Sequence, residues 1–355
     1  MTEPLPQGAT IGILGGGQLG RMLSVAASRL GYCCHIYEPG TAPAGDVAHR
    51  VTTAPYEDEA ALRAFAASVD VITYEFENVP TSALDLLEAL RPIRPNRRAL
   101  AVSQDRIEEK SFLNALGLQT APWAAVNSES DLQAAAQALG LPAILKTTRL
   151  GYDGKGQVRL DSEADIPAAW AAMNGAPSVL EGFIAFDREI SVIAARGADG
   201  SVAAYDPGEN IHRDGILRTT TVPARLSSGQ QADAVLVAAR ILNALDYVGV
   251  MGVELFVTRA GLLVNEIAPR VHNSGHWTQQ GCTVDQFEQH IRAVAGLPLG
   301  DGGRYADVVM ENLIGDDLAR VPHLLQDRDV ALHLYGKGAP RPGRKMGHVN
   351  RVSRG

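Results

Sequence analysis

Val250-Met-Gly-Val-Glu-Leu-Phe-Val257 is a short apolar run that carries one glutamate, and Leu262-Leu-Val-Asn-Glu-Ile267 is a second. We interpret them as the strands of a β-hairpin with a three-residue loop, Arg259-Ala-Gly261, in which Gly261 is left-handed. Glu254 then lies directly opposite Glu266, where Cβ atoms are about 4.5–5.5 Å apart and like charges destabilise the pair. The hairpin therefore predicts a cation between the two carboxylates, or one protonated carboxylate. The alternative is an edge hairpin with a slipped register.

Composition describes a globular protein with more than one domain. The 355 residues exceed one ordinary hydrophobic core, and 46% of them are hydrophobic while 20% are charged. The net charge of −8 argues against a nucleic-acid partner, whereas local basic clusters can still bind anionic small molecules. Cys33, Cys34 and Cys282 form no metal-binding spacing and indicate reduced thiols. Residues 1–10 show no signal pattern and no apolar run reaches membrane length, so we expect a cytoplasmic protein without a membrane partner.

The order of strand and helix patterns predicts an α/β protein with an open parallel sheet at its start. Strand-like runs at Thr10–Leu14, Cys34–Glu38 and Val69–Tyr74 alternate with helical stretches over about the first 100 residues. From about residue 178 to 270 the pattern changes to strands and hairpins. A basic segment rich in glycine, proline and arginine, residues 336–355, ends the chain.

A glycine-rich turn follows the first of these strands. Gly15-Gly-Gly-Gln-Leu-Gly20 has the spacing of the dinucleotide fingerprint, and Glu38 ends the second strand 18 residues later. The helix N-terminus at this turn can hold a phosphate or a carboxylate. Many α/β domains without redox chemistry share the turn, and no later segment supplies a hydride-transfer site. We therefore expect no NAD, and we keep a nicotinamide-dependent oxidoreductase as an alternative that titration with NADH and with Mg-ATP would separate.

A lysine at the end of an apolar strand precedes a second glycine-rich loop. Lys146 ends the run Pro142-Ala-Ile-Leu-Lys146, where an ammonium group needs an anion or open water. In the following Gly151-Tyr-Asp-Gly-Lys-Gly-Gln157, the glycines let backbone N–H groups approach phosphate oxygens, and Lys155 adds charge. The alternative is a plain hairpin turn of the Asp-Gly type.

The next segment has the form of a strand edge that can bind an adenine. Val179-Leu-Glu-Gly-Phe-Ile184 is followed by Asp187-Arg-Glu-Ile-Ser191, so Glu181 and Glu189 would meet the exocyclic amine and the ribose hydroxyls. Together with the lysine and the glycine loop, this segment predicts a phosphoryl-transfer site that uses ATP.

This order of lysine, glycine loop, glutamate-bearing hinge and paired glutamates resembles that of the ATP-grasp ligases. From about residue 10 to 350 the chain is similar, within them, to the family of 5-(carboxyamino)imidazole ribonucleotide synthases. The segments that carry the resemblance are Gly15–Met22, Thr73–Asn78, Gly151–Gln157, Asn265–Trp277 and Arg341–His348. The resemblance implies that ATP phosphorylates bicarbonate to carboxyphosphate, which carboxylates the amine of 5-aminoimidazole ribonucleotide in purine biosynthesis. It implies an N-terminal pre-ATP-grasp domain (1–103), an ATP-grasp domain (104–300) with a lid (about 122–185), and a C-terminal segment (301–355).

The resemblance also implies which residues contact each substrate. For ATP these are Arg106, Lys146, Gly151, Tyr152, Asp153, Gly154, Lys155, Gly156, Gln157, Glu181, Gly182, Phe183, Ile184, Glu189, His212, Asn265 and Glu266. For the ribonucleotide they are Gln18, Leu19, Glu77, Tyr152, Asp153, Lys337 and Arg344, the last two at its 5′-phosphate. Arg270, His272 and Asn273 match the bicarbonate and carboxyphosphate region and would be catalytic together with Lys146. Glu254 and Glu266 become the metal ligands, in agreement with the hairpin pairing.

Two positions differ from patterns common among the relatives. Many ATP-grasp enzymes have a metal-binding Asn where this chain has Ala268, and the narrower family shares the alanine, so the ligands of the metal are two glutamates with phosphates and water. Lys155 stands where relatives often have Arg, which keeps the charge and loses a fork of donors.

The expected cofactors are ATP and Mg²⁺, with Mn²⁺ as an alternative ion and neither NAD nor biotin. The expected partners are small molecules and a second copy of the chain in a homodimer. Another ATP-grasp carboxylate–amine ligase, such as the formate-using glycinamide ribonucleotide enzyme or a biotin carboxylase, is the nearest alternative. A non-catalytic ATP-binding regulator would lack Glu254 or Glu266, and both are present.

Overall fold

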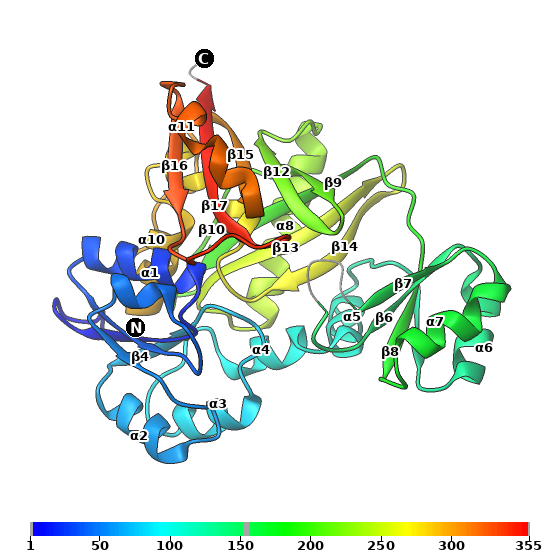
Figure 1. The fold of residues 1–355 in the computed structure, drawn as a ribbon, viewed down its shortest axis with the longest axis horizontal. Helices are drawn as coiled ribbons and strands as arrows, with labels where there is room; N and C mark the ends of the chain where they lie inside the picture. Colours follow the sequence, from blue (N-terminus) through cyan, green and yellow to red (C-terminus); the bar gives the residue numbers. More distant parts are fainter. Residues whose placement is uncertain (1–2, 152–155, 354–355) are drawn as a thin grey trace.

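The computed structural model describes residues 3–151 and 156–353, whose strands form three sheets (Figure 1). The first sheet has the order β3-β2-β1-β4 and is parallel throughout. This confirms the open parallel α/β unit at the start of the chain. Its elements are β1 (Thr10–Leu14), α1 (Gln18–Arg29), β2 (Cys33–Tyr37), β3 (Arg50–Thr52), α2 (Glu59–Ala67), β4 (Val71–Tyr74) and α3 (Thr81–Glu88).

A carboxylate of the protein itself occupies the glycine turn between β1 and α1. The backbone N–H groups of Gly17 and Gly20 donate to Glu75 at 2.5 and 2.8 Å. Gly15 has φ +99°, and a Cβ there would lie 2.5 Å from the Glu75 side chain, so only glycine fits. Glu38 accepts from the N–H of Gly16 at 2.8 Å. A dinucleotide pyrophosphate bound at this turn would have to displace Glu75.

We expect Glu75→Gln to destabilise the fold, because one acceptor oxygen becomes an NH₂ group that faces a backbone donor. The expected loss in free energy of unfolding is about 1–3 kcal/mol, measured by urea denaturation. Glu59→Gln is the control, because Glu59 is exposed at the start of α2 and its ion pair with Arg63 spans 3.7 Å. Equal unfolding midpoints for the two variants would show that the Glu75 contacts do not stabilise the turn.

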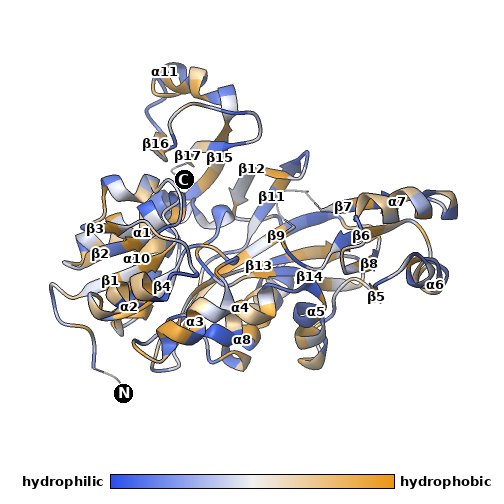
Figure 2. Cartoon of the chain, turned by 60° about the horizontal axis from the view of Figure 1, so that its bottom comes forward, coloured by the Kyte–Doolittle hydropathy of each residue, from blue (hydrophilic) through white to orange (hydrophobic). Residues whose placement is uncertain are grey.

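A small antiparallel sheet forms a separate lobe, which lies at the right in both Figure 1 and Figure 2. Its strand order is β5-β8-β6-β7, and its buried core, which includes Val126, Leu132 and Leu145, is distinct from those of the other sheets. Two helices, α4 (Arg97–Ser103) and α5 (Arg106–Ala115), precede it in the chain. The lobe contains β5 (Trp123–Val126), α6 (Glu129–Leu139), β6 (Ala143–Thr147), β7 (Gln157–Leu160), α7 (Ile166–Ala172) and β8 (Ser178–Gly182).

The largest sheet has nine strands in the order β14-β13-β9-β11-β12-β15-β17-β16, with β10 beside β9, so the C-terminal strands continue the sheet that carries the glutamate hairpin. Helices cover both faces of its centre. Val192 and Ala194 of β9 face the core under α8, whereas Ile193 and Ala195 face the core that contains α10 and α1. The elements are β9 (Arg188–Arg196), β10 (Val202–Ala204), β11 (Gly208–Arg213), β12 (Ile216–Val222), α8 (Ser228–Ala244), β13 (Gly249–Thr258), β14 (Gly261–Ala268), α9 (Thr278–Gly281), α10 (Gln286–Ala295), β15 (Asp307–Ile314), α11 (Val321–Leu324), β16 (Val330–Leu334) and β17 (Lys345–Ser353).

The glutamate hairpin has the predicted pairing and a different loop. Glu254 of β13 is directly opposite Glu266 of β14, as predicted. The prediction of a three-residue loop was wrong, because Thr258 pairs with Gly261 across a two-residue turn. A β-bulge at Asn265 then shifts the register by one residue and brings the two glutamates opposite each other.

Among the described residues, no helix is both long enough and apolar enough to span a bilayer. The three cysteines are free, and Cys34 and Cys282 are buried.

Candidate active site

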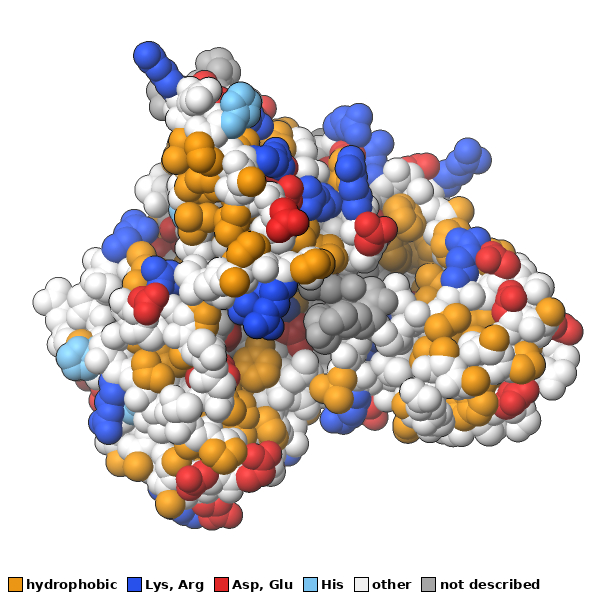
Figure 3. Space-filling model, in the orientation of Figure 1, with side chains coloured by type: hydrophobic (Ala, Val, Ile, Leu, Met, Phe, Trp, Pro, Cys, Tyr) orange, Lys and Arg blue, Asp and Glu red, His pale blue; other side chains and the backbone are white. Residues whose placement is uncertain are grey.

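A cavity of about 990 Å³ lies where the N-terminal sheet, the small lobe and the nine-stranded sheet meet. Figure 3 shows basic and acidic side chains close together near the middle of the molecule. The cavity brings together most of the residues expected to bind substrates. The members of that set that line it are Gln18, Leu19, Glu77, Arg106, Lys146, Gly151, Gln157, Glu189, His212, Glu254, Asn265, Glu266, Arg270, His272, Asn273, Lys337 and Arg344.

Other members of the expected set lie outside this lining. Glu181 is buried behind it, where Lys146 contacts one carboxylate oxygen at 2.9 Å and Lys110 the other at 3.2 Å. Gly156, Gly182, Phe183 and Ile184 are likewise absent from the lining. The expected contacts of Tyr152, Asp153, Gly154 and Lys155 fall outside the described residues.

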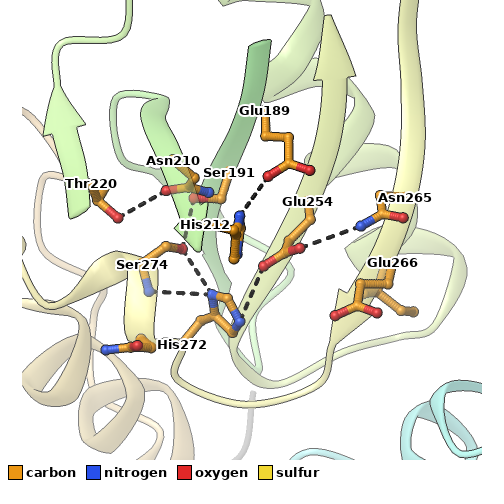
Figure 4. A network of polar contacts seen from close by, with 12 residues as sticks. Glu189, Ser191, Asn210, His212, Thr220, Glu254, Asn265, Glu266, His272 and Ser274 are labelled. Carbon is orange, nitrogen blue, oxygen red and sulfur yellow. Dashed lines mark hydrogen bonds and ion pairs between the residues drawn. The ribbon is translucent and has the colours of Figure 1, made fainter. Parts of the chain in front are cut away.

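The facing glutamates form the acidic centre of the cavity (Figure 4). Burial, together with the charge of Glu266, raises the pKa of Glu254 to about 7. The bulged Asn265 places its amide nitrogen 3.5 Å from Glu254. Two facing carboxylates that repel each other at a cavity wall are donors that suit a hard divalent cation. The residues present therefore fit Mg²⁺.

Helix α5 supplies two charged groups beside this centre. Arg106 lies 3.4 Å from a carboxylate oxygen of Glu266. Glu109 accepts a hydrogen bond from the backbone N–H of Ile267 at 2.7 Å, and burial together with the charge of Glu266 raises its pKa to about 8. Glu109 was not predicted. Its signal was the helical spacing, since Glu109 lies one turn before the buried Leu113 on the inner face of α5.

Two histidines lie beside the acidic centre (Figure 4). His212 of β11 contacts Glu189 through Nδ1 at 2.5 Å, and that contact, with the charge of Glu254, raises its pKa although burial opposes the change. His272 places Nε2 3.5 Å from Glu254 and Nδ1 2.8 Å from the Ser274 hydroxyl. Burial and the charge of Arg270 hold the pKa of His272 well below its ordinary value, so this imidazole is neutral at neutral pH.

Residues 270–273 cross the cavity between two of its walls. Arg270 forms a bidentate ion pair with Glu77 of the N-terminal unit, in which Nη2 donates at 2.7 Å. Asn273 exchanges two side-chain hydrogen bonds with Asn312 of β15, at 3.0 and 2.7 Å. Asn312 was not predicted, although it continues the buried alternation of Val308 and Met310 along the strand.

The C-terminal segment returns to the N-terminal glycine turn. Lys337 donates to the Gln18 side chain at 2.5 Å, which joins residues 319 positions apart. The N–H of Arg344 donates to the carbonyl of Arg341 at 3.0 Å, and Gly343 between them has φ +74°, so a tight turn fixes the backbone of Arg344 at the cavity. Lys345 also lines the cavity.

An aromatic stack forms part of the wall on the side of the small lobe. Phe186 and Phe256 are stacked with ring centroids 4.7 Å apart, and both line the cavity. Sequence patterns did not identify this pair, because only Phe256 lies on a predicted strand of the hairpin, whereas Phe186 lies in the connection between β8 and β9. Stacked rings beside a lysine and an acidic pair provide an apolar surface for a nucleobase.

Three family models match the chain in sequence order. The ribonucleotide synthetase pre-ATP-grasp domain matches residues 8–104, the ATP-grasp domain matches residues 111–287, and the phosphoribosylaminoimidazole carboxylase C-terminal domain matches residues 308–354. An N5-carboxyaminoimidazole ribonucleotide synthase from Brucella melitensis is 58% identical over 353 residues, which cover 98% of this chain and 97% of the relative.

Solved structures agree with these matches. A crystal structure of N5-carboxyaminoimidazole ribonucleotide synthetase in complex with ADP has a TM-score of 0.96 and 40% identity, covering 100% of this chain and 95% of that one. The enzyme from Aspergillus clavatus, in complex with ADP and 5-aminoimidazole ribonucleotide, has a TM-score of 0.92 and 32% identity, covering 98% and 94%.

Proposed function

Because the chain belongs to the N5-carboxyaminoimidazole ribonucleotide synthases, a family of ATP-grasp ligases, we propose that its cavity joins bicarbonate to 5-aminoimidazole ribonucleotide at the expense of ATP. The observation that carries the proposal is the meeting of three groups in one cavity. Glu254 and Glu266 provide the acidic centre, Lys146 and the stacked phenylalanines line one side, and Gln18 with Lys337 line the other. The reaction belongs to purine biosynthesis.

The chemistry requires two bond exchanges. A bicarbonate oxygen bonds to the γ-phosphorus of ATP and ADP leaves, which gives carboxyphosphate. The exocyclic amine of the ribonucleotide then bonds to the carboxyl carbon, the carbon–oxygen bond to phosphate breaks, and the amine loses a proton. Arg270 pairs with Glu77 of the N-terminal unit, His272 contacts Glu254 of the acidic centre, and Asn273 lines the same cavity, so we assign the three residues to bicarbonate and carboxyphosphate. Lys337 and Arg344 are assigned to the ribonucleotide 5′-phosphate, where charge-assisted hydrogen bonds are strong.

We assign Mg²⁺ to Glu254 and Glu266, with Mn²⁺ as the alternative ion. When bound, the ion neutralises negative charge on the phosphates during phosphoryl transfer. Arg106 holds the carboxylate of Glu266 in place, and Glu109 holds the strand through the N–H of Ile267. Lys146 is assigned to the phosphates of ATP. To bind them, its ammonium group would leave its ion pair with Glu181. Stacking of adenine on Phe186 and Phe256 completes the assignment for ATP.

The direct test measures ADP and phosphate release with each substrate omitted in turn. We expect ADP formation to depend on bicarbonate, and carboxylated ribonucleotide to form only when ATP, bicarbonate and 5-aminoimidazole ribonucleotide are all present. ATP hydrolysis that is indifferent to bicarbonate would overturn the proposed reaction. Replacement of the ribonucleotide by glycinamide ribonucleotide with formate tests the nearest alternative ligase.

We further propose that the protein is a cytoplasmic homodimer. The support is the family membership together with the unpaired thiols of Cys33, Cys34 and Cys282. Sedimentation equilibrium should give twice the mass of the 37.7 kDa chain. A monomer at micromolar concentration would contradict the dimer.

A further inference from the structure

The first turn of α10 carries a buried glutamine that binds the backbone of His272 on both sides. The Gln286 side-chain oxygen accepts from the N–H of His272 at 2.9 Å, and its nitrogen donates to the carbonyl of the same residue at 2.8 Å. The same nitrogen lies 2.9 Å from Nδ1 of His276. Because a backbone N–H can only donate, the oxygen must face it, which fixes the orientation of the amide. Gln286 has no exposed surface.

The neighbouring backbone leaves room for this contact. A Cβ at Gly275 would lie 2.6 Å from the Gln286 side-chain oxygen, and a Cβ at Gly252 would lie 2.7 Å from Cβ of His272. Both distances are shorter than side chains tolerate, so residues larger than glycine would push Gln286 or His272 out of place. Strand β13, through Gly252, and the loop after β14, through Gly275, therefore both pack closely against His272 or its partner Gln286.

Buried polar side chains also hold Asn273 and Ser274, the two residues that follow His272. Asn312, which is fully buried, exchanges two hydrogen bonds with the Asn273 side chain and donates a third to the carbonyl of Leu217 at 2.9 Å. The Ser191 hydroxyl donates to Ser274 at 2.7 Å, and Ser274 in turn contacts the His272 ring. His272 and Asn273 thus enter the cavity from a segment whose backbone and side chains are fixed by buried amides and hydroxyls.

We propose that Gln286 is a positioning residue for the carboxylation step, which it serves by fixing His272 and thereby the place of bicarbonate and carboxyphosphate. Gln286 does not line the cavity, so it acts through His272 and not on a substrate. This inference rests on the assignment of His272 to bicarbonate. When the His272 backbone is released, carboxyphosphate forms in a poorly defined position and is lost to water before the amine reacts.

The same helix provides a matched control. Gln289, one turn after Gln286, binds the backbone of Gly300 in the same reciprocal way, with both hydrogen bonds at 2.8 Å. It is also fully buried, but Gly300 lies outside the cavity lining. Gln286→Met and Gln289→Met therefore each remove a reciprocal pair of backbone hydrogen bonds from a buried position on α10, the first also removes the contact with His276, and only the first affects the cavity segment.

The experiment compares these two variants in the complete enzyme assay. For Gln286→Met we expect the KM for bicarbonate to rise about tenfold, and the ratio of ATP hydrolysed to ribonucleotide carboxylated to rise at least about twofold. The KM for ATP should stay within about twofold of the wild-type value. Gln289→Met should lower the thermal midpoint to a similar degree and leave the ratio unchanged. Gln286→Glu, which keeps size and the acceptor for the His272 N–H, should also uncouple the reaction, because its second oxygen faces the carbonyl oxygen of His272.

Three outcomes would overturn the inference. Equal ratios and bicarbonate constants for the methionine variants at 286 and 289 would give Gln286 a purely structural role. A tightly coupled Gln286→Glu enzyme with a normal bicarbonate constant would do the same if the methionine variant does not fold. His272→Ala separates this inference from the site assignment. A normal KM for bicarbonate in His272→Ala would overturn the assignment itself. A raised KM in His272→Ala together with a normal KM in Gln286→Met would overturn the inference alone.

Discussion

Glu266→Gln is expected to lower kcat by about 100-fold or more while the fold remains intact. The change removes one of two facing carboxylates and replaces it with a neutral group of the same shape. In phosphoryl transfer, charge neutralisation and positioning make up most of the catalysis, and about 2.7 kcal/mol of lost stabilisation already corresponds to 100-fold. The measurement is the rate of ADP release at saturating ATP over a range of Mg²⁺ concentrations.

The control for this variant is Glu209→Gln, which changes a glutamate of the same sheet that pairs with Arg225 at 2.7 Å and does not line the cavity. It should retain wild-type turnover. The circular dichroism spectrum of Glu266→Gln should match that of the wild type, because Glu266 is partly exposed and its ion pair with Arg106 spans 3.4 Å. Wild-type turnover in Glu266→Gln would disprove the metal assignment.

The glutamate pair shows what alternation along a strand can predict. A period of two places Glu254 and Glu266 on facing strands without any knowledge of the fold, and the structure confirms the pair. The route to it was wrong in its details, because the turn is one residue shorter and the bulge at Asn265 restores the register. Bulges depend on the packing of the strand against its neighbours, which the local sequence of a hairpin does not contain.

The glycine turn shows the limit of a local motif. The spacing of Gly15, Gly17 and Gly20 predicted a strand, a tight turn and a helix, and all three are present. The group that occupies the turn is Glu75, which follows β4 and reaches the turn because β4 pairs with β1. A contact between residues more than fifty positions apart, set by sheet pairing, is invisible to a motif of six residues.

Buried polar side chains were the part of the site that sequence patterns missed most often. Lys110, Gln286 and Asn312 have at most 1% exposed surface, yet their residue types are ordinarily found at the surface. Gln286 follows Asp285, which caps α10, so its sequence context is that of an ordinary helix start. The resemblance to a family supplied the residues that we assign to substrates, whereas the residues that hold them in place were found only from the fold.

Arg344→Ala is expected to raise the KM for the ribonucleotide at least about tenfold, because a lost charge-assisted contact of about 1.5–3 kcal/mol corresponds to that range. The turn between Arg341 and Arg344 fixes this arginine at the cavity, on the same C-terminal segment as Lys337. The KM for ATP should change little, since the assigned ATP contacts lie on α5, the small lobe, β9, β11 and the glutamate hairpin, and none lies on the C-terminal segment.

Arg351→Ala is the matched control, because Arg351 lies farther along the same segment in β17, pairs with Asp327 at 2.9 Å and does not line the cavity. It should leave both constants unchanged. Equal weakening toward the ribonucleotide and ATP in Arg344→Ala would indicate a structural role for the segment, and unchanged constants would mean that Arg344 is an ordinary solvated charge. A rise in the KM for the ribonucleotide alone would indicate that Arg344 binds the ribonucleotide phosphate and not ATP. Only an ATP-grasp enzyme with a phosphorylated acceptor requires a cation at this place.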